Sequence, residues 1–446
     1  MPSLNKLSPV KENFRRLTSR SDVAKVLAWG KLVSITGSTQ LVVQAIGFAC
    51  GILVIRLLPT QEYALYTLAN TMLGTMIVLA DGGIASGVMA QSGKVWQDRT
   101  RMGVVLTTGL ELRKKFATGS LLVATPVLVY LLRHHGASWP MALLIVAALI
   151  PAFLSSLAGN LLEIAPKLHQ DIVPLQKIQV GNNSGRLVLQ CLVLFAFPWA
   201  FVAVLAAGLP QLWANWRLRT ISQPYADSDQ ISDPVIRREI LAVVKRMLPD
   251  AIYFCLSGQI TVWLISLVGS TAAVAQIGAL GRLAMLLTLF SVVFNTIVSP
   301  RFARLPTGSQ LLLTRYLQLQ AGLAVLCLGI VGGTWLFSNQ LLWVLGKNYA
   351  NLQTELVLNM AAGSLSLMYG ASFYLCAFRG WAINPLIFIP ISILSIASGV
   401  TFLDISTLRG IITLNIFVVS IQLIMLTIYS ILKMRRAQQT PQVSIG

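Results

Sequence analysis

Long apolar runs dominate the pattern of hydrophobic and polar positions along this chain. They recur at lengths of about 18 to 25 residues, and a helix of about 20 apolar residues is long enough to cross a bilayer. Glycine, proline and charged residues, which end helices, separate these runs. The pattern predicts helices over residues 32–57, 63–92, 116–134, 139–164, 176–197, 199–218, 249–268, 273–298, 315–338, 352–378, 382–403 and 409–433. We therefore predict an all-α integral membrane protein with about twelve transmembrane helices.

The amino-acid composition has too little charge for a soluble protein. Of 446 residues, 55% are hydrophobic and 11% are charged, and the mean hydropathy is +0.73. Soluble domains have about 25% charged residues, so this chain lacks the polar surface to coat a water-soluble fold. The sequence has no Walker A, GxSxG, HExxH or CxxC motif, and the adjacent His134 and His135 lack further ligands for a metal. We expect no enzyme activity, no cofactor and no metal site.

The basic residues are divided unequally between the two sides of the predicted membrane. If the N-terminus lies inside, the basic residues of the outer side are Arg56, Arg133, Lys347 and Arg409. Arg186 and Arg282 fall within helices, and the rest of the 34 lysines and arginines fall inside. This asymmetry predicts a multi-pass protein of the cytoplasmic (inner) membrane with both termini in the cytoplasm. It also explains the formal charge of +19, so we expect contact with anionic membrane lipids and no nucleic-acid partner.

A polar stretch divides the chain into two halves. Residues 220–247 contain three aspartates, and Asp233-Pro234 is typical of an N-cap followed by the first helical turn. We predict two six-helix bundles around a central cavity. The predicted domains are a basic cytoplasmic N-terminus (1–31), an N-terminal six-helix bundle (32–219), a cytoplasmic linker (220–247), a C-terminal six-helix bundle (248–433) and a cytoplasmic tail (434–446).

The two halves carry a weak internal match. One shift places Ala45–Asn70 over Leu256–Gly281 without a gap, so that a helix, a short outer loop and a second helix coincide. Residue identity is low, and the shared pattern of helix, loop and helix carries most of the signal. Such a match between halves of like topology is typical of parallel repeats around a central cavity.

Three arginines fall inside predicted helices. Arg186 lies near the middle of the fifth helix after a polar patch that includes Asn182, Arg282 lies at similar depth in the eighth, and Arg56 lies near the outer end of the first. A charge near the bilayer centre costs about 2.5–3.5 kcal/mol on insertion scales, so it usually faces a cavity or a partner. Guanidinium groups bind phosphate bidentately, which makes the three arginines, with Asn182 and Asn70, candidate residues for binding an anionic substrate. The alternative is structural pairing with an acid, or extension of Arg56 to the interface.

Three acidic residues are candidates for ion coupling or for a gate. Asp81 lies toward the inner end of the second predicted helix, where Gly82 and Gly83 allow the backbone to bend or a neighbouring helix to approach. Its carboxylate is suited either to an H+ or Na+ coupling ion or to a gate ion pair. Glu163 and Asp250 lie near inner helix ends and are weaker candidates.

The sequence resembles the polysaccharide biosynthesis flippases, the O-antigen-type transporters of the multidrug/oligosaccharidyl-lipid/polysaccharide exporter superfamily. The stretch from Arg56 to Tyr66 (RLLPTQEYALY) and the segment Leu79–Ile84 (LADGGI) carry most of the resemblance. Ile277–Arg282 (IGALGR) and Ser299–Phe302 (SPRF) are similar in style in the second half. The rest of the chain matches by topology.

This resemblance implies a V-shaped pair of six-helix bundles that works by alternating access. It implies a polyprenyl-diphosphate-linked oligosaccharide as the substrate, with cavity arginines that meet the diphosphate, and other polysaccharide assembly proteins as partners. Arg56 and Arg282 fall on the helices where that cavity is expected. Arg186, on the fifth helix, would be a further arginine beside the two that the resemblance implies. The sequence departs from the family in having few acidic residues for the cavity.

Two other functions compete with the flippase. A drug/cation antiporter of the same superfamily needs acids in its cavity, and the excess of arginine argues against it. A membrane-bound glycan polymerase or ligase usually needs a large outer loop with catalytic groups, whereas the longest outer segment here, about 338–351, is short.

The predicted topology is testable with reporter fusions. A reporter fused at Gly446 and one inserted in the loop Phe337–Asn351 should report opposite sides of the membrane, because an odd number of helices separates them. Alkaline phosphatase and green fluorescent protein, used as a pair of reporters, show directly on which side of the membrane each fusion point lies. Signals from the same side would contradict the twelve-helix arrangement.

Overall fold

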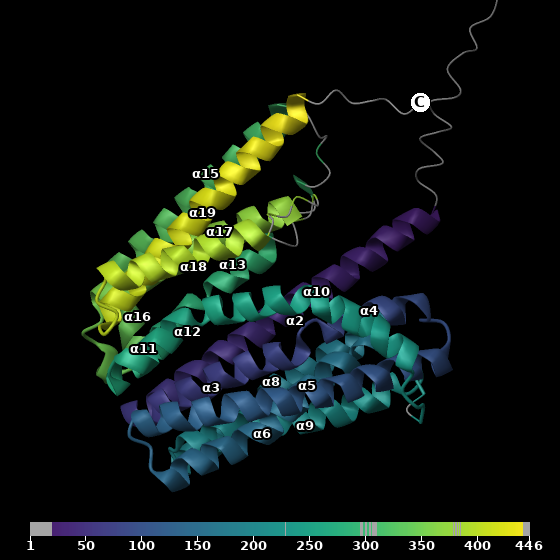
Figure 1. Cartoon of the computed structure of the whole chain (residues 1–446), viewed down its shortest axis with the longest axis horizontal. Helices are drawn as coiled ribbons and strands as arrows, with labels where there is room; N and C mark the ends of the chain where they lie inside the picture. The colour runs from purple at the N-terminus through teal and green to yellow at the C-terminus, as the bar shows by residue number, and fades with distance from the viewer. Residues whose placement is uncertain are drawn as a thin grey trace, which may run out of the picture.

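The computed structural model describes residues 20–227, 229–294, 298, 301, 302, 305, 310–377, 379, 381, 383 and 385–439, which form helices and turns and no strand (Figure 1). The first half contains α2 (Arg20–Leu57), α3 (Thr60–Asp81), α4 (Ile84–Lys94), α5 (Arg99–His134), α6 (Trp139–Leu162), α7 (Ile164–Leu168), α8 (Ile172–Ala196) and α9 (Ala200–Ser222). The second half contains α10 (Pro234–Gly258), α11 (Ile260–Val268), α12 (Thr271–Ala284), α13 (Leu287–Val293), α15 (Gln310–Leu336), α16 (Ser338–Leu345), the 3-10 turn η2 (Lys347–Tyr349), α17 (Gln353–Ala377), α18 (Pro385–Phe402) and α19 (Leu408–Gln439).

Each of the twelve predicted segments corresponds to a helix or to a broken pair of helices in the described residues. By length and composition, eight helices there are apolar enough to cross a membrane, and the pair α10–α11, bent by 55°, adds a ninth. The other three segments are α8 and α9, which carry polar residues, and α18, whose apolar stretch Ile387–Phe402 is shorter. The all-α fold class predicted from the sequence is therefore confirmed.

The helix predicted over residues 63–92 is broken in the middle. Gly82 and Gly83 have φ values of +47° and +96°, which a residue with a side chain rarely adopts. A Cβ atom on Gly82 would lie 2.8 Å from the Leu248 side chain, and one on Gly83 would lie 2.9 Å from Met247. The two glycines therefore turn the chain from α3 into α4 and let α10 of the second half pack against the bend.

Several helices begin earlier than their apolar runs. α5 starts at Arg99, well before the predicted start at residue 116, because the Asp98 carboxylate accepts hydrogen bonds from the backbone of Thr100 and Arg101 and caps the helix. α10 starts at Pro234, and the Asp233 carboxylate accepts from the backbone of Val235, which confirms the predicted N-cap. Residues 234–247 of the predicted linker are thus helical.

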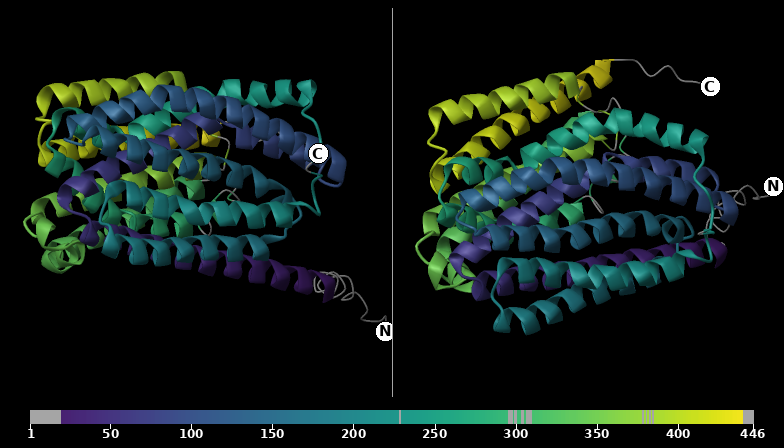
Figure 2. Two further views of the ribbon diagram at one scale, coloured as in Figure 1. Left: turned by 90° about the horizontal axis from the view of Figure 1, so that it is seen from below. Right: turned by 60° about the horizontal axis from the view of Figure 1, so that its bottom comes forward.

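The helices run between two ends of the molecule (Figures 1 and 2). We call one the basic end; it contains the connections 95–98, 169–171 and 223–233, and the described parts of α2 and α19 begin and end there. The opposite end contains the turns 58–59, 135–138, 197–199 and 269–270, together with α16. Positions Leu57 and Thr60, where α2 ends and α3 begins, map under the sequence shift onto Val268 and Thr271, where α11 ends and α12 begins.

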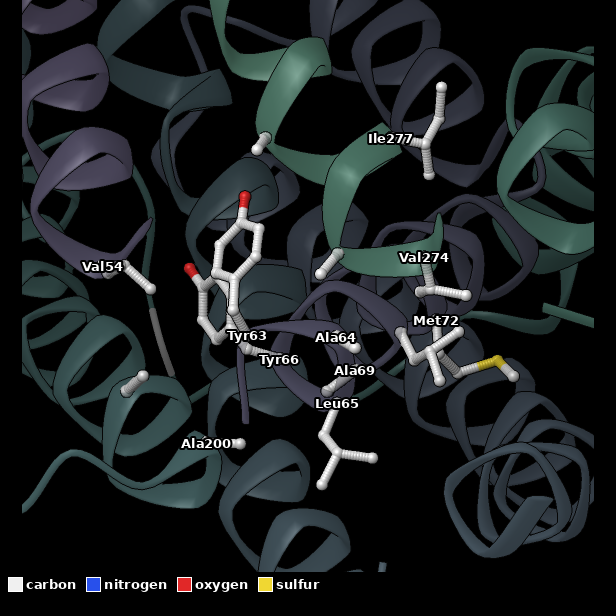
Figure 3. Close-up of a cluster of buried hydrophobic side chains, with 14 of the residues drawn as sticks. Val54, Tyr63, Ala64, Leu65, Tyr66, Ala69, Met72, Ala200, Val274 and Ile277 are labelled. Carbon is white, nitrogen blue, oxygen red and sulfur yellow. The ribbon is translucent and has the colours of Figure 1, made fainter. Parts of the chain in front are cut away.

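Apart from α10, the second half shares a hydrophobic core with the first half near the opposite end, in the part of the chain that the structure describes. This core joins Tyr63, Tyr66 and Met72 of α3 to Val274 and Ile277 of α12 (Figure 3), and it extends to buried residues of α16, α17 and α19. Toward the basic end the described residues form separate cores. One lies within the first half with part of α10, and another lies among α15, α17 and α19. In Figure 1 the helices α15, α17 and α19 diverge from the first half in that direction.

A buried histidine links the halves at the opposite end. His135, in the turn after α5, is 3% exposed. Its Nε2 lies 2.8 Å from the Ser266 carbonyl oxygen, and its Nδ1 lies 3.1 Å from the Thr271 hydroxyl oxygen. Because a carbonyl only accepts, Nε2 carries the proton and Nδ1 accepts from Thr271. Burial lowers the pKa of His135, partly offset by the hydrogen bond to Ser266.

At Gly278 the two halves pack so closely that there is no room for a larger side chain. On α12, a Cβ atom at Gly278 would lie 2.5 Å from Oγ1 of Thr67 on α3. We expect Gly278→Ala to destabilise the protein by about 1–3 kcal/mol, the usual cost of overpacking. Gly281→Ala in the same helix is the matched control, since nothing lies within 4 Å of a Cβ there. It should be neutral or stabilising by up to about 1 kcal/mol. Thermal unfolding in detergent measures both, and equal midpoints would contradict the assigned contact.

Candidate functional site

Two predicted arginines from different halves meet at one tyrosine. The hydroxyl of Tyr66 on α3 accepts a hydrogen bond of 3.4 Å from Nη2 of Arg186 on α8. The guanidinium of Arg282 on α12 lies within electrostatic reach of the hydroxyls of Tyr63 and Tyr66. Figure 3 shows these two tyrosines side by side with their hydroxyls at the same edge of the core, and their ring centroids are 6.1 Å apart. Arg186 and Arg282 therefore form one cationic site.

A glycine on α2 gives Arg282 its path to this site. A Cβ atom at Gly51 would lie 3.0 Å from Cδ of Arg282 and 3.5 Å from its Nε. The side chain of Arg282 therefore passes directly over the backbone of α2. Cys50, the preceding residue, is within electrostatic reach of both Arg186 and Arg282. Arg282 itself is half-buried, and its Nη1 lies 3.6 Å from Sδ of Met285.

A cavity of about 140 Å³ lies inside the first half, next to Arg186. It is bounded by α3, α6, α8 and α9. Arg186 is the one charged residue among those that line it, and the amides of Asn70, Asn182, Asn183 and Gln211 line it too. Nε of Arg186 and Oδ1 of Asn182 are buried without a hydrogen-bond partner among the residues that the structure describes. The site can therefore offer one positive charge and several uncharged polar groups to a ligand.

The third predicted arginine lies elsewhere. Arg56, at the end of α2, is exposed at the opposite end of the molecule. Its Nε and Nη2 donate to the carbonyl oxygens of Val344 and Trp343 at distances of 2.8 and 2.7 Å, and its guanidinium lies 5.0 Å from the centroid of the Trp343 ring. In this conformation Arg56 joins α2 to the end of α16, where carbonyl groups lack partners within the helix.

Two of the three acidic candidates, Asp81 and Glu163, form ion pairs and do not line the cavity. The Asp81 carboxylate pairs with the guanidinium of Arg113 on α5, which is 2% exposed and also donates to the Leu157 carbonyl. Glu163 pairs with Lys167 one turn away, at 2.7 Å. Asp250 belongs to α10, and its side chain lies outside the described residues.

Sequence reasoning missed several residues of this site. Tyr63 and Tyr66 were noted only as part of a longer stretch, and Gln211 was not singled out. Gln211 and Asn215 stand four residues apart in the predicted sixth helix, so they share a face. Two amides on one face of an apolar helix are a usable signal for a polar site, by the same argument that singled out the arginines.

The fold itself is shared with known transporters. No protein-family model matches the chain, and no curated protein matches it in sequence. Among solved structures, an inward-facing multidrug resistance MATE family transporter of the MOP superfamily matches with a TM-score of 0.66 and 16% identity, over 90% of this chain and 96% of that one. The chain has the fold of a MOP-superfamily transporter. The helices of both halves of this chain can therefore be compared with those of a solved transporter.

Two further MOP-superfamily structures bear on conformation and on polarity. An outward-facing multidrug resistance MATE family transporter matches with a TM-score of 0.57 and 15% identity, over 92% of this chain and 96% of that one. A MOP superfamily transporter from Pyrococcus furiosus, whose binding pocket is described as having reverse polarity that suggests a different function, matches with a TM-score of 0.58 and 15% identity, over 92% and 97%.

The ion pair of Asp81 predicts a structural rather than a coupling phenotype. Asp81→Asn leaves the buried Arg113 without its counter-charge, which typically costs about 3–5 kcal/mol. We expect reduced abundance in the membrane and a lower unfolding temperature. Glu163→Gln removes a partly exposed pair between neighbouring turns, worth at most about 1 kcal/mol, and should be tolerated. Normal abundance of Asp81→Asn with abolished transport would instead favour a coupling role.

Proposed function

We propose that this protein is a secondary flippase that moves a polyprenyl-diphosphate-linked oligosaccharide from the inner to the outer leaflet for surface polysaccharide assembly. The observation that carries the proposal is that Arg186 of the first half donates to the hydroxyl of Tyr66 while Arg282 of the second half lies within electrostatic reach of the same hydroxyl. A pair of guanidinium groups is suited to the two phosphates of such a headgroup, because each forms charge-assisted hydrogen bonds with phosphate oxygens.

The position of the arginines suits transport by alternating access. Toward the basic end α15, α17 and α19 have a core of their own, apart from that of the first half and α10, so a site between the halves would be reached from that end. We propose that this basic end faces the cytoplasm, with both termini there, and that the membrane is the cytoplasmic membrane. The headgroup then enters from the inner leaflet while the lipid tail remains in the bilayer between helices.

A drug/cation antiporter is the second candidate, because the transporter that matches with a TM-score of 0.66 is a multidrug resistance protein. A cationic substrate is stabilised by carboxylates. Among the residues that line the cavity there is one arginine and no acid, and Asp81 is already paired with Arg113. The transporter with a pocket of reverse polarity supports the idea that this fold accommodates pockets of more than one charge.

Replacing the two arginines tests the proposal. Arg186→Ala and Arg282→Ala should each remove charge-assisted contacts of about 1.5–3 kcal/mol, which weakens headgroup binding roughly ten- to a hundred-fold. Export should be abolished with membrane abundance retained. Lysine at either position keeps the charge without the planar fork, so export should fall only in part. The readout is surface glycan, with the lipid-linked precursor accumulating in the inner leaflet.

The control and the rival each have a distinct outcome. Arg409→Ala removes an exposed arginine whose partner is Glu355 at 3.0 Å, and it should leave export unchanged. Normal export by both alanine variants of the site would overturn the cationic mechanism. Energy-dependent efflux of ethidium by the wild type, unaffected by either variant, would favour the antiporter.

A further inference from the structure

Four polar groups next to the cavity form a one-directional relay of hydrogen bonds. Nδ2 of Asn182 donates to Oε1 of Gln211 at 2.8 Å, and Nε2 of Gln211 donates to Oδ1 of Asn215 at 3.3 Å. Nδ2 of Asn215 then donates to the Ser155 carbonyl oxygen at 2.6 Å. The relay crosses from α8 through α9 to α6 and runs from the cavity into the buried interior.

The last acceptor fixes the orientation of every amide in the relay. A backbone carbonyl only accepts, so Asn215 has to present its NH₂ group to Ser155 and its oxygen to Gln211. Gln211 in turn has to present its oxygen to Asn182. A Cβ atom at Gly159 would lie 2.8 Å from Oδ1 of Asn215 and 2.9 Å from Nε2 of Gln211, so the backbone of α6 packs directly against this link. Flipping one amide would break the relay at two places.

The open end of the relay is an acceptor. Oδ1 of Asn182 is buried and has no hydrogen-bond partner in the described part of the chain, while Asn182 lines the cavity. An unpaired buried acceptor costs about 1–3 kcal/mol, so a ligand that donates to it recovers that energy. An ionised diphosphate has no donor to offer. The hydroxyl or amide N–H groups of a sugar do, and uncharged amides are suited to such groups.

We infer that the cavity binds the first sugar ring of the substrate headgroup and that Asn182 accepts a hydrogen bond from it. This inference rests on the proposed function, with the diphosphate at Arg186 and Arg282. The cavity of about 140 Å³ is well below the range of about 300–1,000 Å³ that encloses a drug-sized ligand. It has room for one ring rather than a chain of sugars, so the remaining sugars extend beyond it.

Soluble analogues with and without a sugar separate the two parts of the site. The probes are farnesyl diphosphate and farnesyl diphosphate linked to N-acetylglucosamine, glucose or galactose, titrated against the full chain in lipid nanodiscs. The quantity measured is the ratio of affinities between a sugar-bearing probe and farnesyl diphosphate. For the wild type we expect a ratio of at least about ten for one or more of the sugars.

Substitutions in the relay should reduce this ratio toward one. Asn182→Leu removes the acceptor. Gly159→Ala displaces the link between Gln211 and Asn215 and leaves the Asn182 acceptor in place, so it should lower the ratio less. Gly329→Ala on α15, where nothing lies within 4 Å of an added Cβ, is the control and should keep the wild-type ratio. Arg282→Ala should weaken all probes together.

The outcomes distinguish this inference from the proposed function. If the wild type binds farnesyl diphosphate and no sugar improves the affinity, the sugar site is wrong and the anion site stands. The same holds if Asn182→Leu keeps the wild-type ratio, or if it abolishes binding of every probe, which would make Asn182 a structural residue. If the wild type binds none of the probes, the flippase proposal itself fails, and the sugar site fails with it.

Discussion

A guanidinium group inside an apolar helical bundle has to be surrounded by polar atoms, and this requirement organises the structure around Tyr66. The Tyr66 hydroxyl accepts a hydrogen bond from Arg186 of the first half, and Arg282 of the second half lies within electrostatic reach of the same hydroxyl. To reach it, Arg282 crosses the backbone of α2 where Gly51 leaves room. The contact between the halves around Tyr66, which we call the joint, is therefore polar at its centre and closely packed around it.

This joint explains why the halves meet at one end and separate toward the other. Tyr63 and Tyr66 belong both to the cationic site and to the core that both halves share (Figure 3). An anion that binds the arginines competes with the tyrosine hydroxyls for the same donors. Occupancy of the site and the contact between the halves are thus linked through shared atoms, which is the kind of differential contact that alternating access requires.

Much of the fold follows from the sequence because each run of apolar residues is long enough to decide its own structure. The end of α2 and the start of α3 lie within two or three residues of their predicted positions, and Asp233 caps α10 as expected. The break at Gly82-Gly83 was expected only as a freedom to bend, since its direction depends on Leu248 and Met247 of a distant helix. The early start of α5 was missed because its first turns are basic, and hydropathy does not register a capped polar extension.

The candidate site was predictable in its charges and not in its partners. Arg186 and Arg282 are charged residues within apolar runs of the sequence, where charges are rare, so the sequence alone is enough to find them. That they meet at Tyr66 depends on how α8 and α12 pack on α3, and no local pattern contains this information. The partner of Asp81 could not be predicted for a different reason. Asp81 pairs with Arg113, and the sequence pattern placed Arg113 before the start of the helix predicted over residues 116–134. Arg56 was correctly placed near a helix end, but its carbonyl partners on α16 belong to a helix that no apolar run predicted.

The histidine at the opposite end makes the closure of that end sensitive to the medium that it faces. The contact of His135 with both Ser266 and Thr271 exists for one tautomer of the neutral ring. Because burial lowers its pKa, the stabilisation is fully present above the ordinary histidine value of 6.5 and is lost as the pH falls below it. Protonation turns Nδ1 from an acceptor into a donor, so the Thr271 hydroxyl has to rotate and accept, and it places a positive charge at a buried position. Acid at this end of the molecule would therefore weaken the contact between the two halves there.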